Sequence, residues 1–218
     1  TQMLTGVWGT SPTDVFAAGY QFLSSTTLHY DGMNWTQADT AETRGITAGW
    51  SASPAKVFAV GEDGPRGVIR HFDGQHWSQV VREVTFHDVW GSSPSDVFAV
   101  GDEGTILHFN GTDWGTMASH TTGGLRGVWG SSSHDVFAIG TEGTLHYDGV
   151  GWSLQSPEPA TPARTNIWGT GPSDVFLKEE NGGAKHYDGM GWTTHRLAGS
   201  TEFMYGLWGT SGSDIFVV

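Results

Sequence analysis

Residues 88–114 read DVWGSSPSDVFAVGDEGTILHFNGTDW and contain one unit of a repeat that fills the chain. The unit has a Trp-Gly pair, an apolar VFAV run, and a His-aromatic-Asn-Gly stretch before a second Trp. The first Trp recurs at spacings of 42, 40, 39, 39 and 40 residues, as Trp8, Trp50, Trp90, Trp129, Trp168 and Trp208. The second Trp recurs as Trp35, Trp77, Trp114, Trp152 and Trp192, so the two series account for all 11 Trp of the 218-residue chain.

Each unit contains four short segments with the composition of β-strands, separated by turn residues. In the third unit they are Val84–Gly91, Asp96–Val100, Thr105–Phe109 and Trp114–Ala118. The second of them is apolar on consecutive residues rather than on alternate ones. Both faces of that strand are therefore expected to be buried, with further sheets packed on each side.

Units of about 40 residues with four antiparallel strands and two buried faces are typical of the blades of a β-propeller. The sequence predicts an all-β, single-domain propeller over residues 1–218, with units starting near 1, 43, 83, 122, 161 and 201. The first two strands occur six times and the last two five times. We therefore expect five complete blades and a two-stranded sixth. The alternative is a five-bladed ring with the last segment docked elsewhere.

The repeat resembles bacterial β-propeller repeats of the BNR/Asp-box kind, including photosystem-assembly-factor-like propellers, and the blades of tectonin-type and other propeller lectins. An Asp-box has Ser or Thr two residues before its Asp and one residue between Asp and Gly. Here His stands at the first place and Asp or Asn directly precedes Gly, as in HYDG and HFNG. The resemblance therefore implies no sialidase activity. It implies secretion or display on a bacterial cell surface, or a periplasmic location.

Composition narrows the possible partners. Ten Lys and Arg against 23 Asp and Glu give a net charge of −13, which argues against nucleic acid and anionic membranes as partners. The absence of Cys excludes disulfides and thiolate chemistry, and no apolar run is long enough for a membrane-spanning helix. We expect no cofactor. Calcium is the alternative that stays open, and no contiguous calcium-loop spacing supports it.

The periodic His and Asp residues are predicted to be structural. One copy per blade places them around a ring, too far apart to share one metal ion. We expect each His to bind a backbone group or a nearby carboxylate, and each Asp before VF to cap the preceding turn through backbone bonds. The His residues are His29, His71, His108, His146 and His186, and the Asp residues are Asp14, Asp96, Asp135, Asp174 and Asp214, with Lys56 at this place in the second unit.

Length variation gathers in the loops that join the second strand to the third and one unit to the next. In a propeller these loops share one face, and variable loops on a rigid scaffold commonly form binding sites. The candidate ligand-binding residues of this face are Tyr20, Arg44, Glu62, Arg66, Asp102, Glu103, Arg126, Glu142, Arg164, Glu179 and Tyr205.

The sequence favours a non-enzymatic recognition module, with carbohydrate as the first expected ligand because of the lectin-like blades. A structural or protein-interaction propeller that self-associates through its incomplete last blade is the alternative, since exposed strand edges recruit other chains. A glycoside hydrolase or lyase is third, because no catalytic motif is found.

Overall fold

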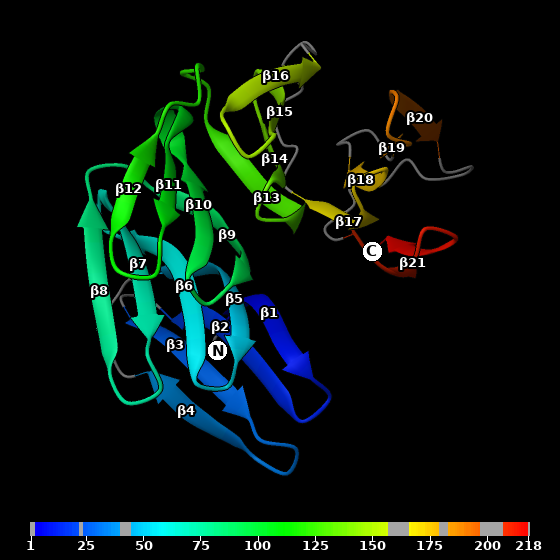
Figure 1. Ribbon diagram of the computed structural model, residues 1–218. Helices are drawn as coiled ribbons and strands as arrows, with labels where there is room; N and C mark the ends of the chain where they lie inside the picture. Colours follow the sequence, from blue (N-terminus) through cyan, green and yellow to red (C-terminus); the bar gives the residue numbers. More distant parts are fainter. Residues whose placement is uncertain are drawn as a thin grey trace.

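The computed structural model describes residues 3–21, 24–39, 45–156, 166–178, 183–196 and 207–217. Over these ranges the chain forms five four-stranded antiparallel sheets and one two-stranded sheet, in the order of the repeat (Figure 1). The innermost strands contact one another in chain order, so the sheets follow each other around a common opening. The protein is a β-propeller whose sixth blade has two strands, as the repeat predicts.

Each blade runs from an inner first strand to an outer fourth strand. The first three blades consist of β1 (Met3–Ser11), β2 (Asp14–Gln21), β3 (Ser24–Tyr30), β4 (Trp35–Asp39), β5 (Gly45–Ser53), β6 (Lys56–Asp63), β7 (Arg66–Phe72), β8 (Trp77–Arg82), β9 (Phe86–Ser93), β10 (Asp96–Gly101), β11 (Ile106–Phe109) and β12 (Trp114–Met117). The rest consist of β13 (Leu125–Ser132), β14 (Asp135–Gly140), β15 (Gly143–Tyr147), β16 (Trp152–Ser156), β17 (Ile167–Gly171), β18 (Asp174–Lys178), β19 (Gly183–Tyr187), β20 (Trp192–Arg196), β21 (Leu207–Ser211) and β22 (Asp214–Val217).

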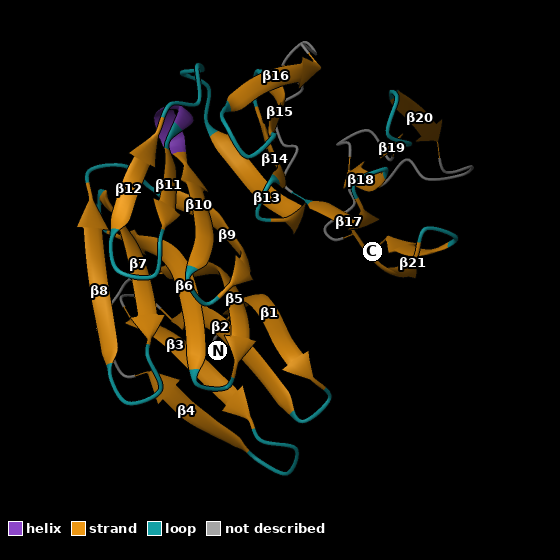
Figure 2. Cartoon of the chain, viewed as in Figure 1, coloured by secondary structure: helices purple, strands orange, loops and turns teal. Residues whose placement is uncertain are grey.

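The strand boundaries of the third unit differ slightly from those predicted. Pairing in β9 begins only at Phe86, opposite Gly101, so Val84 and Thr85 belong to the connection between blades. Thr105 ends a 3₁₀ turn, η1 (Asp102–Gly104), instead of beginning β11. Figure 2 shows this turn as the one helical segment of the described chain.

Residues of one row lie side by side across each sheet. In the first blade Trp8 pairs with Phe16, and Phe16 pairs with His29. The ring centroids of Phe16 and His29 are 4.4 Å apart, and those of Trp8 and Phe16 are 6.0 Å apart. The same register recurs in the other complete blades, which explains why the repeat keeps three aromatic positions in step.

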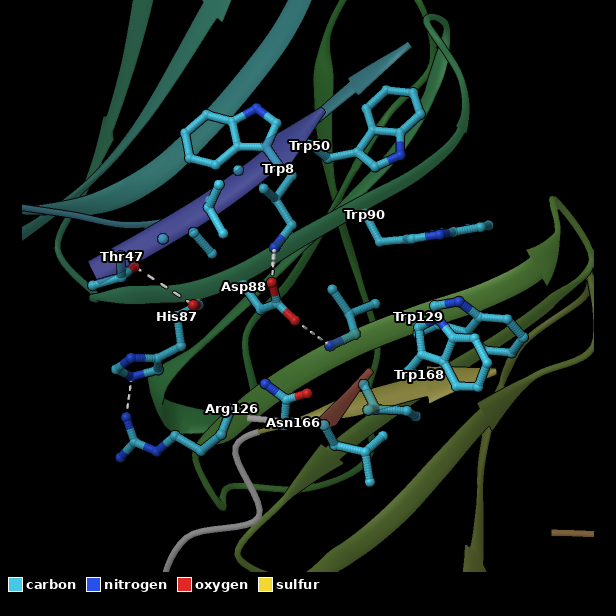
Figure 3. Close-up of a pocket in the computed structure, with 18 of the residues that line it drawn as sticks. Trp8, Thr47, Trp50, His87, Asp88, Trp90, Arg126, Trp129, Asn166 and Trp168 are labelled. Carbon is cyan, nitrogen blue, oxygen red and sulfur yellow. Dashed lines mark hydrogen bonds between the residues drawn. The ribbon is translucent and has the colours of Figure 1, made fainter. Parts of the chain in front are cut away.

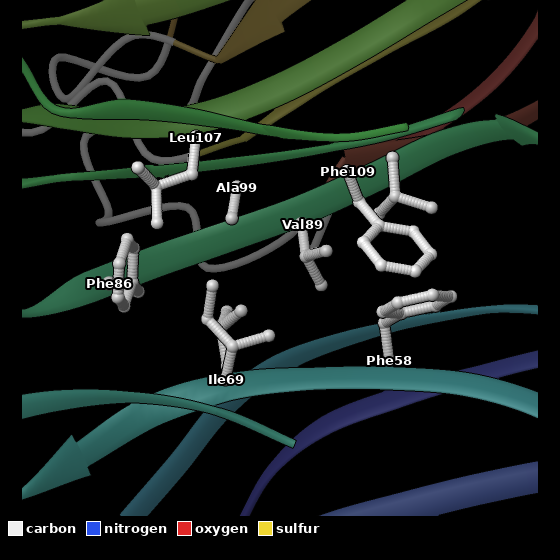
Figure 4. Packing of buried hydrophobic residues seen from close by; sticks show 9 residues of the cluster. Phe58, Ile69, Phe86, Val89, Ala99, Leu107 and Phe109 are labelled. Carbon is white, nitrogen blue, oxygen red and sulfur yellow. The ribbon is translucent and has the colours of Figure 1, made fainter. Parts of the chain in front are cut away.

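The hydrophobic core lies between neighbouring sheets rather than inside any one of them. One cluster joins Phe58 and Ile69 of the second blade to Phe86, Val89 and Leu107 of the third (Figure 4). The second strands of the second to fifth blades are buried on both faces, as their consecutive apolar residues predict. Each blade is therefore stabilised by its neighbours.

The Trp-Gly pair has a direct role in this stacking. A Cβ atom added to Gly130 would lie 2.7 Å from the ring of Trp90, the inner Trp of the preceding blade. The same close approach joins Trp129 to Gly169 and Trp168 to Gly209. Since real Cβ atoms do not come so close, glycine at this place lets each Trp ring lie flat on the next blade.

Recurrent polar residues of the repeat form one small network in each of the first, third, fourth and fifth blades. Asp14 Oδ1 lies 2.7 Å from His29 Nε2, and its other oxygen accepts a hydrogen bond from the Thr10 hydroxyl. Equivalent His–Asp distances are 2.6 Å for His108–Asp96, 2.6 Å for His146–Asp135 and 2.8 Å for His186–Asp174. Four of the five His residues thus bind a nearby carboxylate as expected, whereas His71 Nε2 is buried without a hydrogen-bond partner. The predicted backbone cap by Asp is wrong, because the carboxylate binds two side chains, a hydroxyl four residues earlier and the imidazole of the third strand.

The final strand pair continues the stack. β21 contacts β17, and the ring of Trp168 lies against Gly209. This is the contact that joins the complete blades, so β21 and β22 occupy a sixth blade position. The alternative of a five-bladed ring with this segment docked elsewhere is wrong.

Candidate functional site

The inner strands enclose a cavity of about 890 Å³. Its walls come from β1, β5, β9, β13, β17 and β21, and from Phe216 of β22 (Figure 3). We call it the axial cavity. Inner Trp residues line one part of it and Thr47, His87, Asp88, Arg126 and Asn166 supply polar groups. Its volume is within the range of roughly 300–1,000 Å³ that is typical of small-ligand and cofactor pockets.

One position of the repeat, three residues before the inner Trp, supplies a polar side chain to the cavity wall in each of the first four blades. It holds Thr5, Thr47, His87 and Arg126 in the first four blades. The hydroxyls of the two threonines donate hydrogen bonds to backbone carbonyls. Thr5 donates to the Ile46 carbonyl of the next blade at 2.6 Å, and Thr47 donates to the Val60 carbonyl at 3.1 Å. His87 and Arg126 therefore provide the chemically distinct groups of this ring.

His87 and Arg126 form a cluster with Asp102 across the third and fourth blades. His87 Nε2 lies 2.9 Å from Asp102 Oδ1, and Arg126 Nη1 lies 3.2 Å from the same oxygen. Arg126 Nη1 also contacts His87 Nε2 directly, as the dashed line in Figure 3 shows. Because a guanidinium only donates hydrogen bonds, His87 Nε2 accepts from Arg126, and Asp102 Oδ1 then accepts from Arg126 rather than from this nitrogen. Asp102 comes from the η1 turn, so a variable loop fixes the side chains that enter the cavity.

Asp88 lies next to this cluster and joins the same two blades. Its Oδ1 accepts from the Val89 amide at 2.9 Å and its Oδ2 accepts from the Val128 amide of β13, also at 2.9 Å. Burial disfavours the charged form and raises the pKa of Asp88 to about 7, although both amide bonds act in the opposite direction. In other units this place, two residues before the inner Trp, holds Gly6, Ala48, Gly127, Asn166 or Gly206.

Among the predicted ligand-binding residues whose side chains the structure describes, Asp102 and Arg126 form an ion pair, and Arg126 is the one that lines the axial cavity. Arg66 pairs with Glu83 at 3.1 Å, and Glu142 accepts hydrogen bonds from Thr121 and Thr122 at 2.5 and 3.4 Å. Glu62 lies near the end of β6, and Glu103 is an exposed residue of η1 with φ +57°. The side chain of Tyr20 and all of Arg44, Arg164, Glu179 and Tyr205 lie outside the described residues.

Sequence reasoning did not single out His87 or Asp88 as site residues. The signal was present, because alignment of the units on the inner Trp puts a carboxylate where the described neighbours have Gly, Ala or Asn. A comparison of loop lengths between units could not find these residues, because they lie within a strand. Among the described residues no group of three or more His, Asp or Glu is arranged to hold a metal ion. The described ranges also contain no helix that is long and apolar enough to cross a membrane.

Comparison with known proteins identifies the fold alone. No family model and no curated protein matches the chain. YCF48 bound to a D1 peptide is 15% identical with a TM-score of 0.70, and the match covers 99% of this chain and 75% of that one. The Cps50 (Swd1) propeller of Myceliophteria thermophila is 12% identical with a TM-score of 0.75, covering 100% and 80%. A streptogramin B lyase is 10% identical with a TM-score of 0.78, covering 99% and 76%. The similarity to BNR/Asp-box and tectonin repeats stays a prediction.

Proposed function

We propose that this propeller is a non-enzymatic recognition module that binds an extended polypeptide segment in the axial cavity, with Arg126 holding a carboxylate of the ligand. The observation that carries this proposal is the position of Arg126. It lies on the cavity wall of a protein whose net charge is −13. A carboxylate-bearing ligand would be repelled by most of the surface and attracted at this place.

The geometry of the cluster leaves Arg126 able to bind a ligand. Its two contacts with His87 and Asp102 involve Nη1. A guanidinium has five N–H donors, and among the described residues no partner is seen for those on Nε and Nη2. The side chain is 35% exposed. Planar, paired donors of this kind suit a carboxylate, and the inner Trp residues supply apolar surface beside it.

A propeller with a bound peptide, YCF48 with D1, is among the structures of similar fold, which supports a polypeptide as the partner. Carbohydrate, the first expectation from the sequence, has less support in this cavity. Sugars bind well on open aromatic faces, whereas the rings of Trp90, Trp129 and Trp168 lie against glycines of the next blade.

Catalysis also has less support, despite the raised pKa of Asp88. A general acid or base must reach its substrate with a free oxygen, and both carboxyl oxygens of Asp88 accept backbone amides. These bonds support a role in joining β9 to β13. We therefore expect no turnover of chromogenic glycosides.

The test is selection of random twelve-residue peptides on the immobilised protein, followed by calorimetric titration of those enriched. Peptides with an acidic residue or a free carboxyl terminus should bind, and Arg126→Gln should weaken them about 10- to 100-fold through loss of a charge-assisted hydrogen bond. Arg66→Gln is the matched control, because that exposed Arg pairs with Glu83 and does not line the axial cavity. Equal loss in both variants, or binding on a glycan array without any peptide, would overturn the proposal.

A second function, assembly with another strand-bearing partner, is favoured by the exposed face of the sixth blade. Trp208 is 57% exposed and Phe216 is 51% exposed, whereas Trp168 is covered by Gly209 of the next blade. A blade with glycine in the same register would cover this face. Sedimentation at rising concentration should show association that Trp208→Ser abolishes, and a monomer at every concentration would reject self-assembly.

A further inference from the structure

Three junctions between blades are closed by aromatic rings in the same way. The Phe of the second strand packs against two rings on the outer strands of the next blade, at centroid distances between 5.4 and 6.4 Å. The sets are Phe58 with Phe109 and Trp114, Phe98 with Tyr147 and Trp152, and Phe137 with Tyr187 and Trp192.

The junction between the first and second blades differs. Among the described residues, Phe16 makes ring contacts with Trp8 and His29, both of its own blade. Phe72 and Trp77 are the rings that would complete this junction. They pair with each other at 5.2 Å, as the equivalent rings of the closed junctions do, but no ring contact joins them to Phe16 among the described residues. Between them and Phe16 lies a crevice of about 170 Å³ that Thr36, Ala38 and Pro54 also line. We call it the rim crevice.

The sequence explains why this junction is open. In the strand register, Asp39 stands where the next two blades have Val80 and Met117, because Ala38 is an extra residue in β4. Val80 and Met117 pack against the apolar clusters between the following blades, whereas Asp39 is charged.

This bulge fixes the width of the crevice instead of letting it collapse. The Ala38 carbonyl accepts a hydrogen bond from Trp77 Nε1 at 2.9 Å. Asp39 binds the guanidinium of Arg70 through both oxygens, at 2.9 Å each, and Arg70 lies 5.7 Å from the centre of the Trp77 ring. The two blades are thus tied together by polar bonds beside an apolar gap.

We propose that the rim crevice is a binding site for one aromatic side chain of a polypeptide partner. A planar ring inserted there would meet Phe16 on one side and Phe72 and Trp77 on the other, and would complete the ring packing that closes the three junctions above. Stacking of this kind favours aromatic ligands beyond their buried area.

The polar groups of the rim crevice favour an aromatic ring over a sugar. Its polar side chains are His29 and Thr36. His29 Nε2 is bound to Asp14 at 2.7 Å, and the Thr36 hydroxyl donates to the His29 carbonyl at 3.4 Å. The several hydroxyls of a sugar would enter with few partners, which is costly when polar groups are buried. This site is separate from the axial cavity, because the two share no lining residue.

The experiment is a titration of ¹⁵N-labelled protein with N-acetyl-phenylalaninamide, followed through the indole N–H signal of Trp77. We expect a saturable shift of this signal that methyl glucoside does not reproduce. Ala38→Met, which puts a larger apolar side chain on the wall of the rim crevice, should fill it, abolish the shift and raise the unfolding midpoint. That rise shows that loss of binding is not loss of folding.

Two control variants distinguish binding in the rim crevice from binding elsewhere on the protein. Gln155→Met changes the corresponding extra residue of the fourth blade, whose junction with the fifth is closed by rings, and should leave the shift unchanged. Arg126→Gln should also leave it unchanged, so failure of the axial site and failure of the rim site can be told apart. No saturable shift, a shift that survives Ala38→Met, or a stronger response to the glucoside would overturn the proposal.

Discussion

Replacing Lys56 with Asp should stabilise the protein, because the second blade lacks the polar network of the other complete blades. There, an Asp binds both a His on the third strand and a hydroxyl four residues earlier. The second blade has Lys56 and Ala52 at these two places. His71 Nε2 is consequently buried without a hydrogen-bond partner. Lys56 Nζ instead donates to the Asp73 carbonyl at 2.7 Å on the exposed side of the blade.

The magnitude follows from these contacts. Supplying a partner for a buried polar group is worth about 1–3 kcal/mol, and the exposed Lys56 bond that is lost offsets about 0.5–1 kcal/mol of it. We expect Lys56→Asp to add about 1–2 kcal/mol to the free energy of unfolding, which corresponds to roughly 2–8 °C in the melting temperature. Adding Ala52→Ser should contribute a further hydrogen bond, and the two changes should be more than additive.

The pH dependence gives an independent check. Burial, followed by the charge of Lys56, lowers the pKa of His71 in the folded protein. The unfolded chain therefore binds more protons near pH 6, so His71 costs stability as the pH falls below its unfolded pKa of about 6.5. A carboxylate at position 56 favours protonated His71. The variant should thus lose less stability than the natural sequence between pH 7.5 and pH 5.5.

The assay is thermal and chemical denaturation of four proteins: the natural sequence, Lys56→Asp, Ala52→Ser and the double variant. Ala52→Ser alone should change little, because its hydroxyl would have no carboxylate to bind. Equal or lower stability of Lys56→Asp at pH 7.5, together with an unchanged pH dependence, would refute the view that Asp–His pairing stabilises each blade.

Two further predictions test the junctions between blades. Gly130→Ala should destabilise the protein by about 1–3 kcal/mol, because the added methyl overpacks the inner Trp of the preceding blade. Gly115→Ala, where a Cβ would meet nothing within 4 Å, should be nearly neutral in the same denaturation assay. Asp88→Asn should reduce the dependence of the free energy of unfolding on pH between pH 4 and pH 7. Since the pKa of Asp88 is raised to about 7 in the folded state, the natural protein should lose about 2–4 kcal/mol as the pH rises from 4 through 7. A variant with the same loss would show that Asp88 is not the group responsible.

The fold could be predicted from the sequence because the residues that recur in each unit are the ones that pack between neighbouring blades. The inner Trp of one blade packs against the glycine that follows the inner Trp of the next blade. The consecutive apolar residues of the second strand are there because both faces of that strand are buried. The partner of each His could not be predicted in the same way. A register in which Asp96 faces His108 depends on how the second and third strands pair, and the short turn signals allowed a backbone cap equally well.

The candidate site was harder to predict because it is formed between units. Asp102 lies in a loop that a length comparison could find, but its contact with Arg126 of the next blade depends on the angle between two sheets. Asp88 likewise accepts an amide of β13 that is 40 residues away in the sequence. The repeat in the sequence predicts the structure of one blade, whereas these contacts depend on how two neighbouring blades are placed relative to each other.

Departures from the repeat therefore have two different consequences, and the neighbouring residues decide which. At Lys56 the substitution removes a bond within one blade and leaves His71 without a partner, which lowers stability without creating a cavity. At Ala38 an extra residue lies beside the open junction, and the bonds to Trp77 and Arg70 fix the two blades relative to each other. An unfilled site that is held open by compensating bonds can bind a ligand without first paying for rearrangement. For this reason we infer binding at the rim crevice and only a loss of stability at Lys56.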